Sequence, residues 1–166
     1  NVASSFFSNK WQRSVEELMV SPVRPITLLA GYISGGAARG IATGAIVTLL
    51  SLYFTHLQIH NLLVVVLVIL LSAILFSIGG FINAVFATKF DDIAIIPTFV
   101  ITPLTYLGGV FYSIDLLPGF WQTVSMFNPI LYMVNTFRYG ILGVSDVDVW
   151  FSLGMLVVFI LIFGGF

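Results

Sequence analysis

The feature that most constrains this chain is one long apolar run. Residues 61–87 carry no charged side chain, and every residue from 62 to 71 is apolar. About 20 such residues in a helix cross the hydrocarbon core of a bilayer. Three further segments, 26–54, 93–112 and 149–166, have a similar character. The sequence therefore predicts an all-α membrane protein, a polytopic bundle of four transmembrane helices in a single domain over residues 1–166.

The third of these segments contains residues that normally break helices. Pro97, Pro103 and the pair Gly108-Gly109 all fall within residues 93–112. A membrane helix tolerates such residues where its neighbours satisfy the backbone groups that are freed. We therefore expect polar partners for this helix elsewhere in the bundle.

The remaining composition excludes several classes of function. Charged residues make up only 8% of the chain, against about 25% in a soluble domain. The net charge of −1 gives no electrostatic reason for binding nucleic acid. No Cys is present, and neither His-Glu-x-x-His nor Gly-x-Ser-x-Gly occurs. His56 and His60 have no third metal ligand near them in sequence. We expect no catalytic site, bound cofactor or metal in this chain.

The basic residues predict how the chain is oriented. Lys10, Arg13 and Arg24 precede the first span, and Lys89 lies between the second and the third. The opposite side holds a single base, Arg138. The bias of four to one places the N-terminal segment and the Lys89 loop in the cytoplasm.

Two segments outside the spans have distinct patterns. Residues 11–22 are predicted to hold a short amphipathic helix with Val15, Leu18 and Met19 on its apolar face, a Ser14–Glu17 capping box and an end at Ser21-Pro22. Residues 113–148 are too aromatic for a solvated loop. Prolines at positions 118 and 129 favour two short helices, about 118–127 and 129–142, which are expected to dip into the outer leaflet without crossing it.

Several residues within the spans are candidates for packing or gating. Gly36, Gly40 and Gly44 recur every four residues, a pattern that lets helix backbones approach closely, either within the subunit or beside a pathway. Arg39 is the only base in a predicted span. It either reaches the interface or pairs with Asp91 or Asp92, or it faces a cavity and takes part in gating. The two acids either cap the third helix or form that salt bridge, or contact a partner protein.

Four stretches of sequence stand out together: residues 13–22 (RSVEELMVSP), 31–36 (GYISGG), 86–92 (FATKFDD) and 103–112 (PLTYLGGVFY), the last continuing through Leu117-Pro118, Asn128-Pro129 and the FRYG at 137–140. In these stretches the chain resembles the permease subunits of type-two ABC exporters, and most of all the YadH-like bacterial inner-membrane permeases. The resemblance runs through nearly the whole chain in the order of the family.

The resemblance implies a permease fold of six spans, of which this chain holds the third to sixth. Both ends are then expected to be cut from a longer protein, as the missing initiator Met and the apolar last residues also suggest. It also implies a location in the bacterial inner membrane. Its partners would be a separate ABC ATPase that carries ATP and Mg and a second permease copy, most simply a homodimer with the third span near its axis.

The resemblance further implies that residues 11–22 are the coupling helix seated on the ATPase; an alternative is that this helix only anchors the subunit. The residues expected to make the ATPase contact are Arg13, Val15, Glu16, Glu17, Leu18 and Met19. Two other functions stay open at this point. One is a secondary transporter or channel of unrelated fold, which would need ionisable groups near the midplane. The other is a membrane assembly protein without transport.

Overall fold

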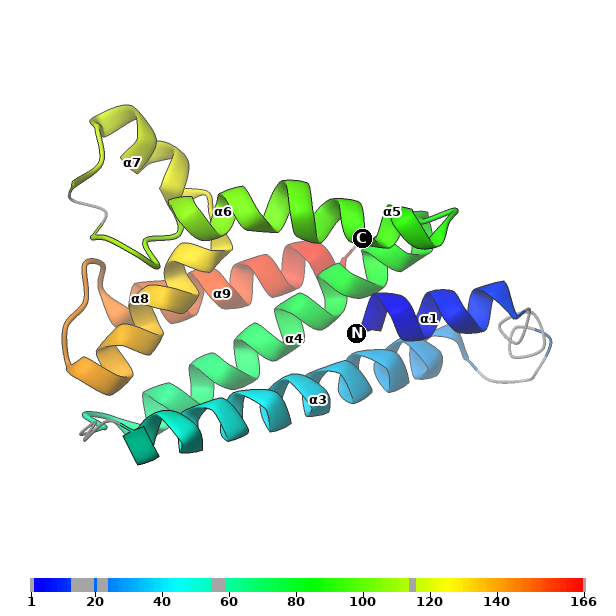
Figure 1. The fold of residues 1–166 in the computed structure, drawn as a ribbon, viewed down its shortest axis with the longest axis horizontal. Coiled ribbons are helices and arrows are strands. Elements are labelled where there is room, and N and C mark those ends of the chain that lie inside the picture. Colours follow the sequence, from blue (N-terminus) through cyan, green and yellow to red (C-terminus); the bar gives the residue numbers. More distant parts are fainter. Residues whose placement is uncertain (1, 13–19, 21–23, 55–58, 114–115, 166) are drawn as a thin grey trace.

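The most apolar segment of the chain becomes the centre of the bundle. In the computed structural model, which describes residues 2–12, 20, 24–54, 59–113 and 116–165, this segment is α4, Leu62–Phe86. Asn61 begins it, because its side-chain oxygen accepts a hydrogen bond from the Val64 N–H at 3.3 Å. Helices α1, α3, α8 and α9 all pack on α4 (Figure 1). A central helix with neighbours on several sides explains why its sequence shows no polar face.

All regular structure in the described residues is helical. The other elements are α1 Val2–Trp11, α3 Pro25–Phe54, α5 Phe90–Ile95, η1 Ile96–Ile101, α6 Thr102–Leu107, α7 Gly119–Met126, α8 Pro129–Leu142 and α9 Val149–Gly164. Helices α3 and α4 are long and apolar enough to cross a membrane. Helix α9 is apolar but has only 16 residues.

The predicted third span is a single helical run, Phe90 to Leu107, with a π-helical turn, η1, in its middle. It begins three residues before the predicted bounds of 93–112 and ends five residues before them. The early end arises because Gly108 closes the helix and Gly109 has a φ of 72°. Pro97 has no N–H to offer the Ile93 carbonyl. The Asn83 side chain of α4 donates to that carbonyl instead, at 3.0 Å. A neighbouring helix therefore repairs this break, as the sequence led us to expect.

Helices α7 and α8 lie within about two residues of the predicted bounds. Asn128 caps α8 by accepting from the Ile130 N–H at 3.0 Å, and Pro129 follows it. The first turns of α8 pack near Leu75 in the middle of α4, with Leu131 only 1% exposed. Its last turn meets the start of α4, where the Gly140 carbonyl accepts from the Asn61 N–H at 2.9 Å. Helix α8 therefore runs from the middle of the bundle to the end where α4 begins, and does not cross to the other end.

Helix α1 was not predicted. Its buried residues, Val2 and Phe7 among them, pack on α4 and α3. The Lys10 ammonium donates to the carbonyls of Val85 and Ala87, at 3.0 and 3.1 Å, where α4 ends. The predicted coupling helix, residues 11–22, falls largely outside the described residues; only Trp11, the last residue of α1, Gln12 and Val20 are described.

The two ends of the bundle differ in charge. The Lys10 contact, the start of α3 after Arg24 and the Lys89 turn before α5 all lie at one end (Figure 1). Arg138 lies toward the other end, with the last turn of α8. We call these the predicted cytoplasmic end and the predicted outer end. The arrangement places the basic residues as the expected orientation requires.

Candidate functional site

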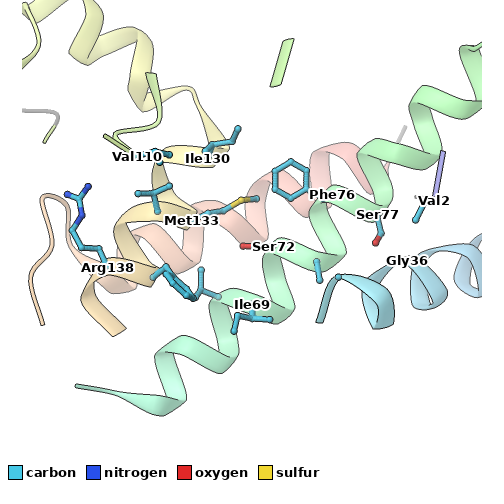
Figure 2. Close-up of a pocket in the computed structure, with 15 residues that line it drawn as sticks. Val2, Gly36, Ile69, Ser72, Phe76, Ser77, Val110, Ile130, Met133 and Arg138 are labelled. Atoms are coloured by element: carbon cyan, nitrogen blue, oxygen red, sulfur yellow. The ribbon is translucent and has the colours of Figure 1, made fainter. Parts of the chain in front are cut away.

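A groove of about 710 Å³ runs along α4. Its walls come from Gly36 and Gly40 of α3, from one side of α4, and from the face of α8 that includes Met133. In Figure 2, Val2 and Arg138 lie at opposite ends of the groove, with Ser72 and Phe76 between them. The walls are mostly apolar. Such a surface suits the packing or passage of apolar groups, and offers no acid–base pair for a reaction.

The glycines predicted for helix packing face α4. A Cβ atom on Gly40 would lie 3.5 Å from the Ala73 Cβ, and one on Gly44 would lie 4.0 Å from the Ile69 side chain. A Cβ on Gly36 would collide with Val2 and would lie 2.8 Å from the Ser77 hydroxyl. Small residues therefore let α3 approach α4 closely, and Gly36 also makes room for α1.

Arg39 lies on the exposed surface of α3 and does not line the groove. The predicted salt bridge to Asp91 or Asp92 is absent from the described part of the chain, where the one ion pair joins Arg138 and Asp146. Asp92 instead accepts hydrogen bonds from Thr88 and Lys89 at the start of α5, and Arg39 and Asp91 are both exposed. A gating role for Arg39 stays a prediction.

Asp92 caps α5. Its Oδ2 atom accepts from the Thr88 hydroxyl at 2.7 Å, the Thr88 N–H at 2.9 Å and the Lys89 N–H at 2.8 Å. The hydrogen bond from the Thr88 side chain, followed by those from the two backbone N–H groups, lowers the pKa of Asp92 below its ordinary value. Asp91 is exposed in the first turn of the same helix. Of the alternatives for the pair, capping by Asp92 agrees with this geometry.

The residues predicted to contact an ATPase lie outside the described residues. They are Arg13, Val15, Glu16, Glu17, Leu18 and Met19. Their role stays a prediction. The described parts nearest to them in sequence, the end of α1 and the start of α3, lie at the predicted cytoplasmic end.

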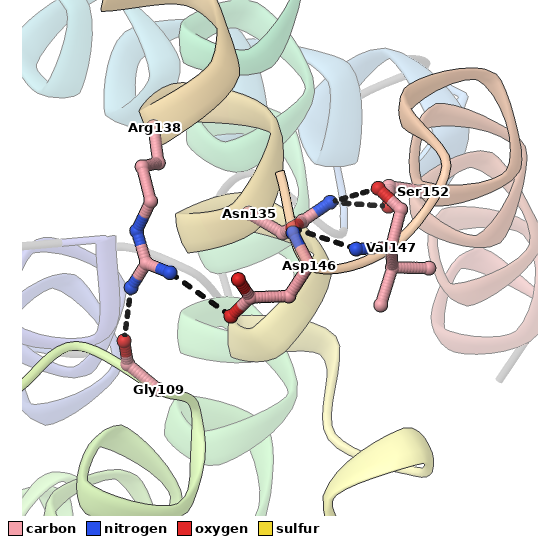
Figure 3. Close-up of polar contacts among 6 residues, drawn as sticks. All are labelled: Gly109, Asn135, Arg138, Asp146, Val147 and Ser152. Carbon is pink, nitrogen blue, oxygen red and sulfur yellow. Dashed lines mark hydrogen bonds and ion pairs between the residues drawn. The ribbon is translucent and has the colours of Figure 1, made fainter. Parts of the chain in front are cut away.

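A polar cluster at the predicted outer end was not anticipated as a site (Figure 3). Arg138 donates from Nη1 to Asp146 at 3.0 Å and from Nη2 to the Gly109 carbonyl at 2.6 Å. Asn135 accepts from the N–H groups of Asp146 and Val147, and donates to the Val147 carbonyl and to the hydroxyl of Ser152. Three separate parts of the chain meet here: the end of α6, α8 and the turn into α9.

Two sequence features belong to this cluster but carried no prediction of it. Arg138 contributed only to the charge bias, and the FRYG stretch only to the resemblance. The partners of Arg138 are 8 and 29 residues away, a spacing that no local pattern reveals.

His60, one of the two histidines considered as metal ligands, packs its ring on Tyr139 at 5.4 Å between centroids. His56 lies outside the described residues, and the described ones contain no group of three potential metal ligands.

The chain is similar to known membrane proteins. A model of the family described as ABC-2 type transporter matches residues 1–142. The chain is 56% identical over 163 residues to the inner membrane transport permease YadH of Escherichia coli K12, covering 98% of this chain and 64% of that protein. It is 27% identical over 161 residues to nodulation protein J of Rhizobium leguminosarum bv. trifolii, covering 97% and 62%.

The similarity to nodulation protein J extends to Rhizobium meliloti, at 23% identity over 93% of this chain and 59% of that protein. The chain thus spans slightly less than two thirds of the length of these relatives. No solved structure matches it.

Proposed function

The chain belongs to the ABC-2 type transporter family, and on that premise we propose that it forms the translocation pathway of an ATP-driven exporter. Family membership confirms the expected resemblance, the all-α fold of a membrane permease and the location in the bacterial inner membrane. A permease of this family is not itself an enzyme. Membership also argues against a transporter of unrelated fold.

The observation that carries the proposal is the match to a transport permease over 98% of the chain. The groove along α4 supports it, since it gives the bundle an internal surface lined by α3, α4 and α8. The exposed apolar surfaces of α3 and η1 support it too, because such surfaces need lipid or another helix to cover them.

In the proposed complex, ATP and Mg bind to a separate ATPase, and two copies of the permease assemble as a homodimer. The ATPase contacts residues 13–19 and holds them differently in its nucleotide states. Only such a difference in contact can shift the permease between its conformations. The acidic pair Glu16 and Glu17 offers the ATPase two charges on one short segment.

Reversing these two charges tests the proposal. In reconstituted vesicles that contain the permease and its ABC ATPase partner, Glu16→Lys with Glu17→Lys should lose transport that depends on ATP. Insertion should stay normal, because the segment lies outside the predicted spans. Transport and ATP hydrolysis are measured together, since uncoupling lowers their ratio.

The matched control is Asp115→Lys, which reverses an acid on the predicted outer side. It should leave the ratio of transport to hydrolysis unchanged. An unchanged ratio in the Glu16 and Glu17 variant would overturn the proposed coupling contact.

A further inference from the structure

We propose that Asn128 and Arg138 are positioning residues that clasp the predicted outer end of α6 to α8, and that release of this clasp opens that end of the groove. The role in opening rests on the transport function proposed above. The clasp itself rests on contacts in the structure.

The clasp uses backbone carbonyls that the end of α6 leaves free. The Gly108 N–H turns back to the Thr105 carbonyl, at 3.2 Å, so it does not serve the Leu104 carbonyl four residues before it. The Asn128 side chain donates to that carbonyl at 2.6 Å. The Arg138 guanidinium donates to the Gly109 carbonyl, also at 2.6 Å.

Within the described part of one chain, few other contacts hold this helix in place. Helix α6 and the π-helical turn before it contain no buried residue. Toward the predicted cytoplasmic end, Asn83 donates to the Ile93 carbonyl beside Pro97. The run from Phe90 to Leu107 is thus fastened by side chains at both ends, with its π-helical turn between them. Since π-helical turns and prolines are the usual places where helices bend, the outer part is able to move on this turn.

Movement of α6 changes the groove, because residues that follow α6 or contact its end also line the groove. Val110, which follows α6, and Ile130 and Arg138 of α8 all face the groove (Figure 2). A Cβ on Gly108 would lie 2.8 Å from the Ile130 side chain, so α6 covers Ile130 directly. When Gly109 separates, Arg138 keeps its ion pair with Asp146 at 3.0 Å. The guanidinium is not left unpaired, which keeps the cost of opening low.

Cysteine labelling tests the clasp, because the chain contains no Cys. Ile130→Cys places a thiol under α6, at a side chain only 8% exposed. Arg138→Lys keeps a positive charge beside Asp146 but lacks the second nitrogen that donates to the Gly109 carbonyl. In membrane vesicles of the full chain, N-ethylmaleimide should label the thiol at position 130 about tenfold faster in this variant. That factor equals about 1.4 kcal/mol, close to one hydrogen bond to a charged group. Asn128→Ala should act in the same direction.

Two controls separate the clasp from a general loss of packing. Leu156→Cys places a thiol in the core, where the side chain is 0% exposed, and its labelling should not change with Arg138→Lys. Asp146→Asn leaves the Gly109 contact in place and should raise Ile130→Cys labelling far less. Labelling that stays unchanged at position 130, or that rises equally at 156, would overturn the clasp.

A second arm tests the opening step. In vesicles that also contain the ATPase, labelling of Ile130→Cys should differ between ATP and ADP. If ATPase binds and Arg138→Lys still raises labelling, but nucleotide has no effect, the clasp is purely structural and the opening step is wrong. If no ATPase binds to the permease, the proposed function fails while the clasp stands on the first arm.

Discussion

At the scale of single residues, several of the charged groups that the structure describes act on helix ends. Lys10 binds the carbonyls at the end of α4, Asp92 caps α5, and Arg138 binds the carbonyl that follows α6. Each charge compensates backbone groups that a helix end leaves without partners. Few charges therefore suffice in a chain in which only 8% of residues are charged.

The Asp92 cap predicts a pH dependence. Because the pKa of Asp92 is lowered in the folded protein from an ordinary value of 3.8, its contribution is present above that value and is lost as pH falls through the lower folded pKa. Asp92→Ala should therefore speed amide exchange at Thr88 and Lys89 at pH 7. In the wild type, lowering the pH below 3.8 and through the folded pKa should reduce the protection factors of the same amides, that is, their intrinsic exchange rate at that pH divided by the observed rate. Exchange measured by mass spectrometry checks this. If Asp92→Ala leaves exchange in the turn unchanged, the cap does not hold it.

At the scale of elements, substitutions at the adjacent Gly35 and Gly36 distinguish the effect of helix packing on stability from the effect of helix propensity. Gly36→Ala should destabilise the contact of α1 and α3 with α4 by about 1–3 kcal/mol, because its Cβ would meet Val2 and Ser77. Gly35→Ala should be neutral or should stabilise by up to about 1 kcal/mol, since nothing lies within 4 Å of its Cβ. Denaturation in detergent, followed by circular dichroism, measures the difference. Equal effects at the two positions would show that α3 does not pack as described.

The elements also show what a sequence can predict and what it cannot. Helices α7 and α8 were found from their prolines, because the signals that begin a helix are local. Helix α1 was missed, since Val2 and Phe7 gain their burial from α3 and α4 rather than from a pattern of their own. The break at Pro97 was foreseen, but its partner, Asn83, lies ten residues from the carbonyl that it serves. The Arg138 clasp joins three elements and has no local signal at all.

At the scale of the whole molecule, the distribution of exposed apolar surface is uneven. Helix α4 buries eight of its residues against its neighbours, more than any other described helix, while α3 and the run through η1 and α6 present most of their large apolar side chains outward. Within a bilayer, lipid covers such surfaces, but so does a second copy of the chain. The proposed homodimer, with the third span near its axis, assigns η1 and α6 to the partner and α3 to lipid.

Single cysteines distinguish these two surfaces. Phe99→Cys lies on η1 at a side chain that is 72% exposed, and Leu49→Cys lies on α3 at one that is 66% exposed. If the third span lies near the dimer axis, copper phenanthroline should join two Phe99→Cys chains in membranes in at least one nucleotide state. Leu49→Cys chains should stay monomeric on a non-reducing gel. The reverse result would move the interface to α3, and cross-linking at neither position in any state would count against a dimer built on these helices.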